Sequence, residues 1–330
     1  MADTVGIDKH LVTVVIPCFN QALFLTDCIN SIRGQSHQNW EAIIVDDGSL
    51  DDTSNVAQQL VAADSRVRFV QQSNAGPSAA RNLGLSLARG DWIQFLDGDD
   101  VLLPAKFEKQ ISVLRSAPAL SLSYTDYRHG DEANVFVQVQ RTRMPCRFTA
   151  ADPLFDLARD WETSFSIPIH APLVAAAFFR EQGIRFDESL RNHEDWDVWM
   201  RVFGKAAEIH FIAEELAVYR TSAGSNSRHK ENNWRGFRNA IDAQLTLYQD
   251  RADVTALLLH KRRETDWSYG VSWKRRWYDR LQGSSAYRMR VPWSVQQWLT
   301  RALSPAKFPW PPLLAHRLAV VREHGADSGM

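Results

Sequence analysis

The hydrophobic pattern of the first half of the chain predicts buried strands that alternate with amphipathic helices. Residues 11–16 form an almost continuous β-branched run that ends at Pro17, which is typical of a strand buried on both faces of a parallel sheet. Apolar residues then recur at helical spacing from Phe24 to Ile32, and Asn20 is placed to cap that helix. The further expected strands are 40–45, 67–70 and 92–96, and the expected helices are 53–62, 78–88 and 104–114.

Polar residues follow three of these expected strands directly. The alternation itself predicts a doubly wound α/β sheet with right-handed crossovers. Ligands bind to such sheets beyond the carboxyl ends of the strands. Those ends carry Asn20, Asp46-Asp47 and Asp97-Gly98-Asp99. The polar residues therefore gather where the fold predicts a site.

A change in the strand–helix pattern and in composition along the chain predicts its domain organisation. After about Tyr124 the alternation becomes irregular, with a hairpin expected around His129-Gly130. From Asn232 onward the sequence favours helices with many Arg and Trp residues. We therefore expect an α/β domain over 1–228, divided into halves of about 1–125 and about 126–228, and a helical extension over 229–330.

Composition and charge exclude several classes of protein. The 330 residues carry a formal net charge of −1, which gives no global attraction to nucleic acid. Three cysteines without zinc-type spacing favour reduced, buried thiols in a cytoplasmic protein. The polar first ten residues do not resemble a signal peptide, and the longest apolar stretch, 173–179, is too short to span a membrane.

The segment Asp97-Gly98-Asp99 is a candidate metal site. Two carboxylates on either side of a glycine can turn toward one hard cation, and Mg²⁺ or Mn²⁺ prefers a few carboxylates together with substrate phosphate oxygens. A solvated acidic turn is the alternative. A calcium loop is excluded because its sixth position, which requires glycine, is Leu102. Asp100 is expected only to begin the following turn.

Two further segments could contact a nucleotide. A carboxylate of Asp46 or Asp47 could accept a hydrogen bond from a nucleobase or a ribose, although a helix cap and turn would explain the same residues. Arg81 lies about one turn inside the helix that follows Gly76-Pro77, where a guanidinium could reach a nucleotide. The alternative for Arg81 is a surface side chain beside a tightly packed helix start.

A fourth acidic segment, residues 193–197, opens an expected amphipathic helix. A carboxylate in a pocket beside Trp196 could act as a general base if desolvation adjusted its pKa. The alternative is that these are ordinary acidic residues at a helix N-terminus, where the helix dipole stabilises negative charge.

Five stretches in order resemble the inverting glycosyltransferase family 2, which has the GT-A fold. Together they span roughly residues 12–220, about two thirds of the chain. Each stretch is a weak motif alone, but five in the family's order are specific. They read VTVVIPCFNQ, EAIIVDDGSLDDT, NAGPSAARNLGL, GDWIQFLDGDD and FDESLRNHEDWDVWMR.

The resemblance implies a fold, a donor and a set of roles. It implies a GT-A fold with a Rossmann-like, mostly parallel sheet, a nucleotide-sugar donor that is usually a UDP-sugar, and Mn²⁺ or Mg²⁺. Asp99 would bind the metal, and Asp195 would deprotonate the acceptor hydroxyl. The donor would be contacted by residues that follow the first four expected strands: Pro17, Phe19, Asn20, Asp46, Asp47, Arg81 and Asp97.

Acceptor-side and loop residues follow from the same resemblance. Segment 166–171 lies where related enzymes carry acceptor residues, so His170 is a candidate contact, with a structural histidine as the alternative. Glu194 and Trp196 flank the expected base. Arg220 precedes a Gly-Ser-Asn-Ser segment that resembles the family's closing loop, and it could pair with phosphate where some relatives have a histidine.

The tail suggests a membrane contact. Residues 261–307 carry eleven Lys or Arg against three acids, and six tryptophans fall between Trp267 and Trp310. Basic residues interleaved with tryptophan suit an anionic membrane interface, so we expect peripheral contact through 261–310 on the inner face. The alternative is that these helices pack on the catalytic domain. Nucleic-acid binding is a poorer match.

We therefore expect an enzyme that moves a sugar to a hydroxyl of a glycan or lipid-linked acceptor in surface polysaccharide synthesis. Two alternatives belong to other classes. A nucleotidyltransferase would need a glycine-rich basic signature near the N-terminus, which Val14 to Asn20 does not provide. A non-catalytic module that binds sugar nucleotides or glycans would not need Asp97, Asp99 and Asp195 together.

Overall fold

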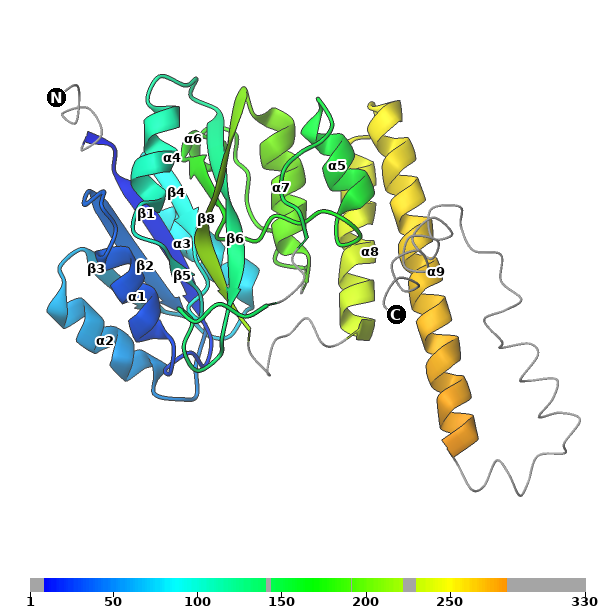
Figure 1. Cartoon of the computed structure of the whole chain (residues 1–330), viewed down its shortest axis with the longest axis horizontal. Coiled ribbons are helices and arrows are strands. Elements are labelled where there is room, and N and C mark those ends of the chain that lie inside the picture. The colour runs from blue at the N-terminus through cyan, green and yellow to red at the C-terminus, as the bar shows by residue number, and fades with distance from the viewer. Residues whose placement is uncertain (1–8, 141–143, 191, 222–229, 284–330) are drawn as a thin grey trace, which may run out of the picture. The chain divides into compact units, whose positions relative to one another are not determined.

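An eight-stranded sheet forms the centre of the part of the chain that the computed structural model describes, residues 9–140, 144–190, 192–221 and 230–283. Its strand order is β3-β2-β1-β4-β7-β6-β8-β5, with helices packed against it (Figure 1). The strands are β1 (Val12–Cys18), β2 (Trp40–Asp46), β3 (Val67–Gln71), β4 (Trp92–Phe95), β5 (Val101–Leu102), β6 (Ser121–Gly130), β7 (Pro172–Ala175) and β8 (Glu208–Arg220).

The first half of the sheet is parallel, as the sequence predicts. β1 lies between β2 and β4 and pairs in parallel with both, and β2 pairs in parallel with β3. All seven residues of β1 and of β2 are buried, which explains their continuous apolar runs. The connecting helices are α1 (Leu25–Arg33), α2 (Thr53–Ala63), α3 (Pro77–Leu87) and α4 (Lys106–Leu114).

Helix α3 packs closely on β1 because a glycine faces the strand. A Cβ added to Gly84 would lie 2.4 Å from Cγ1 of Val15, so a larger residue there would push the helix away. The helix begins directly after Gly76, whose φ is 95°, and Pro77 occupies its first turn. This close contact holds α3, which carries Arg81, against β1.

The second half of the sheet is mixed. β7 is antiparallel to both β4 and β6, whereas β8 is parallel to β6 with a register shift between Thr125 and Tyr127. The hairpin expected around His129-Gly130 turns slightly later: β6 runs through both residues, and the chain turns between Asp131 and Val137. The returning chain lies antiparallel to the end of β6, with a bridge between Gly130 and Gln138 and a 3.0 Å hydrogen bond from Val139 N to His129 O. The predicted α/β class is confirmed.

Five more helices lie in the second half of the described chain. The described chain divides after Arg263, and the predicted boundary at 228 stays a prediction because 222–229 lie outside the described residues, as does most of the segment predicted to contact a membrane. These helices are α5 (Pro153–Asp160), α6 (Ala177–Arg180), α7 (Glu194–Lys205), α8 (Lys230–Leu247) and α9 (Ala252–Gly283).

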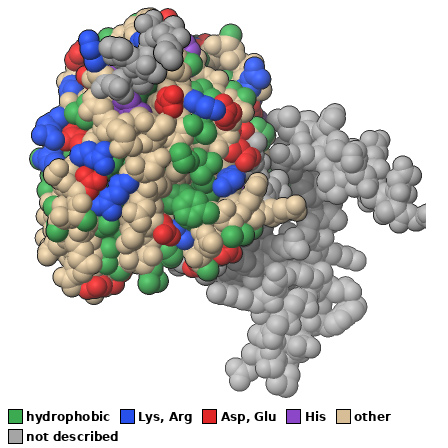
Figure 2. Space-filling model, turned by 60° about the vertical axis from the view of Figure 1, so that its left-hand side comes forward, with side chains coloured by type: hydrophobic (Ala, Val, Ile, Leu, Met, Phe, Trp, Pro, Cys, Tyr) green, Lys and Arg blue, Asp and Glu red, His purple; other side chains and the backbone are tan. Residues whose placement is uncertain are grey.

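The surface is consistent with the near-zero net charge. Basic and acidic side chains lie interspersed on the face shown in Figure 2. Among the described helices, none combines the length and the apolar character needed to cross a bilayer.

Candidate active site

The loops after β1 and β2 are joined through Asn20. Its amide N–H donates to Ser49 Oγ at 2.9 Å, and its side-chain Oδ1 accepts from Leu50 N at 2.8 Å. The prediction that Asn20 caps the next helix is wrong, because Phe24 holds the N-cap position of α1 and Asn20 adopts a left-handed φ of 55°. Beside it, Pro17 is buried in β1 and the Phe19 side chain is 45% exposed. Phe19 is therefore available to a ligand at this edge.

Asp46 and Asp47 hold the neighbouring loops in place. Both side chains are buried, and each accepts three hydrogen bonds from within the chain. These bonds hold the turns and loops after β2 and β3, but neither residue is a helix N-cap, since Asp52 and Gly76 hold those positions in α2 and α3. A nucleoside contact would have to be made in addition and stays a prediction. The donors to Asp46 are Ser49 N, Ser54 Oγ and Gln71 Nε2, and those to Asp47 are Gln72 Nε2, Ala75 N and Gly76 N.

Arg81 connects the two acidic segments predicted for donor and acceptor chemistry. Its Nη2 lies 2.7 Å from Asp97 Oδ1, and its Nη1 lies 2.8 Å from Glu194 Oε1. The side chain is 4% exposed, and its guanidinium carbon lies 5.3 Å from the centre of the Phe186 ring. The prediction of a surface arginine is therefore wrong. Arg81 fixes the turn after β4 against the start of α7.

The turn after β4 concentrates negative charge. Asp100 N donates to Asp97 O at 3.0 Å, which closes the turn. Burial, together with the nearby charges of Asp100 and Asp97, raises the pKa of Asp99 to about 8. A carboxylate in this position is unfavourable without a neighbouring positive charge.

Asp100 does more than begin a turn, contrary to the sequence prediction. It is 2% exposed; its Oδ1 accepts from Arg220 N at 2.8 Å, and its Oδ2 lies 2.9 Å from His170 Nδ1. His170 itself is completely buried, which favours the structural alternative for this residue. Asp100 therefore joins the turn after β4 to β8 and to the segment before β7.

The chemistry of this turn fits a hard divalent cation. The oxygen ligands of Asp97 and Asp99 are those that Mg²⁺ and Mn²⁺ prefer, and a dication would offset the repulsion that raises the pKa of Asp99. Within the described residues, no group of three or more His, Cys, Asp or Glu side chains is arranged to hold a metal by itself. Further ligands would have to come from water or from substrate phosphates.

Arg220 contacts the same turn, and its guanidinium is hydrogen-bonded within the protein. Its guanidinium donates to three acceptors on different segments, and its side chain is 1% exposed. The Gly-Ser-Asn-Ser segment after it lies outside the described residues, so its role as a closing loop and a contact from Arg220 to phosphate stay predictions. The acceptors are Asp99 O at 2.7 Å, Glu132 O at 2.8 Å and Asp27 Oδ2 at 2.9 Å.

The predicted base lies at the start of α7, as the sequence indicates. Burial, together with the charge of Glu194, raises the pKa of Asp195 to about 7, while His193 and Arg81 oppose this shift. Asp195 Oδ1 accepts only a 2.7 Å bond from the adjacent Trp196 N among the hydrogen bonds resolved in the described chain. Trp196 is completely buried and donates to Leu157 O at 2.9 Å. The arrangement favours Asp195 as a proton acceptor and Trp196 as its support.

Sequence reasoning missed two supports of this site. The Asn82 side chain exchanges two 2.9 Å hydrogen bonds with the backbone of Phe186, which ties the segment before α7 to α3. Lys106 is completely buried and donates to Gln94 Oε1 and to Ala171 O, next to His170. Asn82 stood in a recognised motif and could have been suspected, but Lys106 opens an ordinary amphipathic helix and gave no signal.

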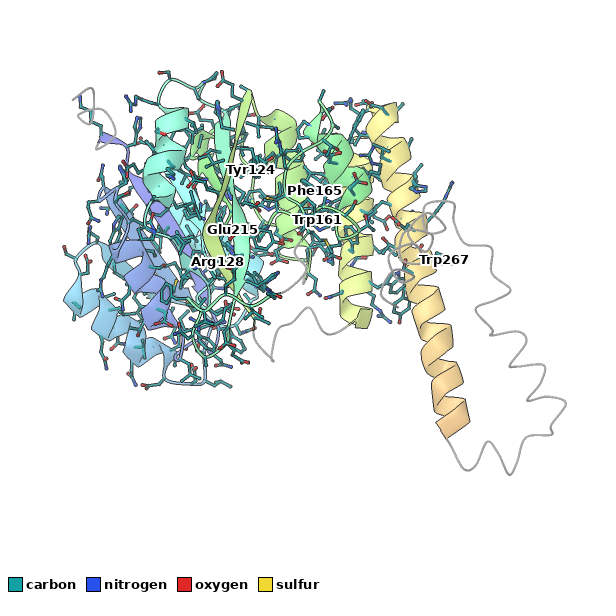
Figure 3. The ribbon with its side chains drawn as sticks, viewed as in Figure 1. Tyr124, Arg128, Trp161, Phe165, Glu215 and Trp267 are labelled. Atoms are coloured by element: carbon teal, nitrogen blue, oxygen red, sulfur yellow. The ribbon has the colours of Figure 1, made fainter. Side chains whose placement is uncertain are left out.

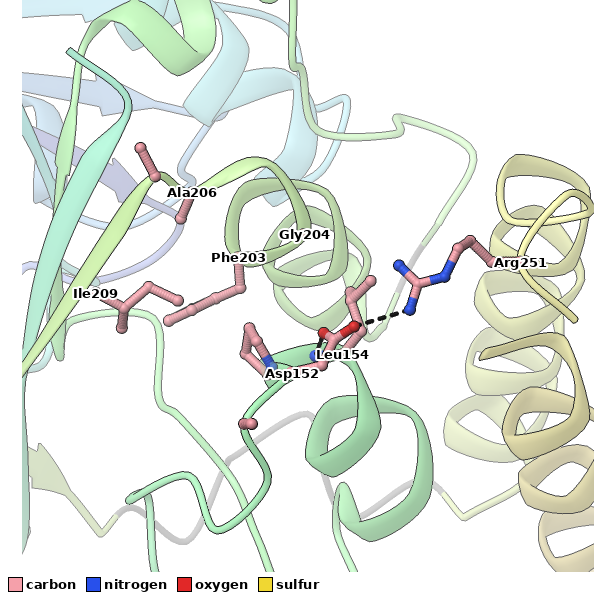
Figure 4. A pocket seen from close by; sticks show the side chains of 10 residues that line it. Asp152, Leu154, Phe203, Gly204, Ala206, Ile209 and Arg251 are labelled. Atoms are coloured by element: carbon pink, nitrogen blue, oxygen red, sulfur yellow. Dashed lines mark hydrogen bonds and ion pairs between the residues drawn. The ribbon is translucent and has the colours of Figure 1, made fainter. Parts of the chain in front are cut away.

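A pocket of about 460 Å³ lies elsewhere on the domain (Figure 4). Its lining includes Leu154, Phe203 and Ile209, and an ion pair of 2.8 Å between Asp152 and Arg251. None of the residues predicted for catalysis or donor binding lines this pocket. It is therefore separate from the candidate site.

Comparison with known proteins gives a consistent result. The family model described as glycosyl transferase family 2 matches residues 13–177. Glycosyltransferase GlyG of Streptococcus pneumoniae serotype 4 is 30% identical over 231 residues, which cover 67% of this chain and 74% of GlyG. The putative teichuronic acid biosynthesis glycosyltransferase TuaG of Bacillus subtilis is 29% identical over 228 residues, or 67% of this chain and 83% of TuaG.

Other relatives are longer than the matched region. The chain spans 62% of the uncharacterized glycosyltransferase EpsJ of Bacillus subtilis and 34% of a Rickettsia felis glycosyltransferase. Among solved structures, residues 1–349 of S. aureus TarS in complex with UDP align with a TM-score of 0.56 at 18% identity, covering 87% of this chain and 77% of that one. The mannosyltransferase PcManGT of Pyrobaculum calidifontis, in complex with GDP-Man and Mn²⁺, aligns with a TM-score of 0.51 at 13% identity, covering 89% and 85%. These structures share the fold.

Proposed function

The chain belongs to glycosyltransferase family 2, and from this premise we propose that it transfers a sugar, with inversion, from a UDP-sugar to an acceptor hydroxyl. The acceptor is a glycan or a lipid-linked glycan of a surface polysaccharide. The relative named for teichuronic acid biosynthesis supports this acceptor class, and TarS, solved with UDP and with UDP-GlcNAc, supports the donor. In this proposal the sugar transfer takes place on the cytoplasmic side of the membrane.

The observation that carries the proposal is the pair of contacts made by Arg81. A single buried guanidinium binds Asp97 at 2.7 Å and Glu194 at 2.8 Å. Asp97 belongs to the turn proposed to hold the donor diphosphate, and Glu194 precedes the proposed base. The contacts thus bring these two segments together, although 97 positions separate Asp97 from Glu194 in the sequence, and this supports a single site for donor and base.

Asp195 is the proposed base. In an inverting transfer the acceptor oxygen attacks the anomeric carbon from the face opposite the leaving diphosphate, and a carboxylate removes the acceptor's proton. A base works best when its pKa lies near the operating pH, and the pKa of about 7 for Asp195 meets that condition. Proton removal of this kind typically contributes ~10²–10⁴-fold to the rate.

Asp99 is the proposed metal ligand, and Asp97 contacts the ribose or the sugar. A bound Mn²⁺ or Mg²⁺ supplies positive charge that stabilises the departing diphosphate. We place Phe19, which is half exposed, next to the nucleoside. Asp46 and Asp47 hold the loops that would surround the nucleobase.

A donor panel tests the proposal. The full chain is incubated with Mn²⁺ and with UDP-, GDP- and dTDP-sugars, and binding is measured by calorimetry and release of nucleoside diphosphate by a coupled assay. We expect metal-dependent binding and slow hydrolysis of one UDP-sugar, both lost with a chelator. With an acceptor in hand, NMR should show an inverted anomeric configuration. Binding of a GDP- or dTDP-sugar instead would refute the UDP assignment, and retention of configuration would refute the mechanism.

A further inference from the structure

Two residues with unusual backbone conformations contact each other beside the proposed base. Glu162 and His193 have left-handed φ angles of 57° and 63°, and His193 Nε2 lies 3.1 Å from Glu162 Oε2. Side chains other than glycine rarely adopt this region, and such conformations persist where the surroundings hold them. The segment before β7 and the start of α7 therefore meet at a point where both backbones are constrained.

The Glu162 side is a short, anchored turn. Glu162 N donates to Phe165 O at 2.9 Å, and Thr163 N and Ser164 N both donate to Asp160 O at 3.0 Å. Trp161 and Phe165 on either side are almost completely buried, with ring centres 6.3 Å apart (Figure 3). The Glu162 side chain is 53% exposed. The anchored turn thus holds the Glu162 carboxylate in a fixed position next to His193.

The His193 side is held by a helix from the region predicted to be the C-terminal extension. The His193 ring is stacked on Phe237 of α8, with centres 4.3 Å apart and planes at 12°. Phe237 also contacts Trp196 of α7 edge-on, at 5.0 Å. Further along the same helix, Gln244 donates to Asp197 Oδ1 at 2.6 Å. Helix α8 therefore contacts the first turn of α7 through aromatic rings and a hydrogen bond, and it lies beyond the residues that the family model matches.

We propose that His193, held between Glu162 and Phe237, is a positioning residue that orients the first turn of α7 and keeps a positive charge beside Asp195. We call these three residues the His193 clamp. The inference rests on the proposed role of Asp195 as base and extends the catalytic apparatus to α8.

The charges around His193 agree with this role. Burial alone would lower the pKa of His193, but the contact with Glu162, together with the charges of Asp195 and Glu194, outweighs burial and raises this pKa. Asp195 and Glu194 act on His193 in the same direction as Glu162, and the charge of Lys261 in α9 acts on Glu162. In return, His193 lowers the pKa of Asp195, against burial and Glu194. A protonated His193 thus favours the ionised base.

His193→Asn tests the clamp with little risk to folding, because asparagine tolerates a left-handed backbone. Loss of the imidazolium should raise the pKa of Asp195 by about one unit, the lower end of what a nearby opposite charge supplies. The acid limb of kcat should move to higher pH by the same amount, and kcat at pH 7 should fall about fivefold while the donor KM stays within about twofold. Glu162→Gln should move the limb in the same direction, and Glu181→Gln, an exposed carboxylate of the same half, should not.

A second readout separates this inference from the proposed function. The Asp195 carboxyl carbon is titrated by NMR in the labelled full chain, with Asp195→Asn as the assignment control. An upward shift in His193→Asn without transfer by the wild type, for any donor, refutes the function and keeps the clamp. Normal transfer with an unmoved acid limb and an unmoved NMR titration in His193→Asn refutes the clamp. A uniform drop in kcat with an unmoved limb indicates a merely structural histidine and also refutes it.

Discussion

Arg81 Nη1 lies 2.8 Å from Glu194 Oε1, a contact between α3 and α7 that spans 113 positions of sequence. The same guanidinium binds Asp97, and its side chain is 4% exposed. Removing one partner of a buried ionic group leaves the others uncompensated, which costs much more than the pair contributes in place. The geometry of both halves of the site therefore depends on this one side chain.

Arg81→Lys should disrupt that geometry while preserving the charge. A lysine is a point charge on a flexible stem and cannot reproduce the planar fork that binds two carboxylates. We expect kcat/KM to fall about 10²-fold, in line with ~3 kcal/mol for breaking a buried pair. Steady-state rates measure this. Arg89→Lys is the matched control, because Arg89, which lies shortly before β4, is 68% exposed and pairs with Glu41 of β2. Equal losses in both variants would contradict the special role of Arg81.

Asp195→Asn should abolish most turnover and leave donor binding nearly intact. The amide keeps the shape of the side chain but cannot accept the acceptor's proton, so we expect a loss of about 10²–10⁴-fold in kcat. Calorimetry with the UDP-sugar checks that affinity is retained. Asp197→Asn, two positions further in α7, tests the assignment: Asp197 is buried against Arg201 and Gln244, so its change should lower the melting temperature and spare more of the turnover. Near-normal turnover in Asp195→Asn would rule out the base assignment.

Turnover should depend on pH through the same carboxylate. The base is active when ionised, and its pKa is raised to about 7 by burial and Glu194. As the pH falls through 7 the carboxylate becomes protonated, so kcat should fall about tenfold per unit on the acid side and level off above it. A profile of kcat from about pH 5 to about pH 9 measures this. The residual activity of Asp195→Asn should lack that limb, and a limb that persists there belongs to another group.

The elements that could be predicted from sequence are those fixed by local pattern. β1 and β2 are buried on both faces, so their continuous apolar runs mark them without knowledge of their neighbours. Gly76-Pro77 likewise marks the start of α3. The acidic turn after β4 followed from its position at the end of such a strand.

What failed depended on contacts between distant segments. Asn20 reads locally as a helix cap, but a loop 30 positions away takes its side chain. Asp100 reads as the start of a turn because its partners, His170 before β7 and Arg220 at the end of β8, come much later in the chain. Glu162 gave no signal, since neither composition nor spacing indicates that its side chain will contact His193.

Asp99→Asn should impair the use of the metal. The neutral amide is a poorer ligand for a hard cation, so binding of Mn²⁺ in the presence of UDP should weaken and turnover should fall about 10²-fold. Electron paramagnetic resonance of Mn²⁺ measures the binding. Asp91→Asn provides the control: Asp91 directly precedes β4 at its opposite end, is 59% exposed and should leave both quantities unchanged. Unchanged Mn²⁺ binding in Asp99→Asn would show that the metal binds elsewhere.

Lys106→Met should lower the stability of the folded protein. Lys106 Nζ donates to Gln94 Oε1 and Gln110 Oε1 at 2.6 Å and to Ala171 O at 3.1 Å, all in the interior. Methionine fills a similar volume but leaves Gln94 Oε1 and Gln110 Oε1 without this donor, whereas Ala171 O still accepts from Thr125 N and Gln110 Nε2. Each buried unsatisfied group costs ~1–3 kcal/mol. We expect the free energy of unfolding, measured with urea, to fall by about 2–4 kcal/mol.

The control for this change lies one turn away on the same helix. Lys109 is exposed and pairs with Glu214 at the surface, so Lys109→Met should change the free energy of unfolding by less than about 0.5 kcal/mol. Because Ala171 adjoins His170, and His170 contacts Asp100, Lys106→Met should also lower kcat at temperatures where the variant remains folded. Equal or greater stability in Lys106→Met would mean that burying the amine costs more than its three hydrogen bonds return, and the network would then be no support for the site.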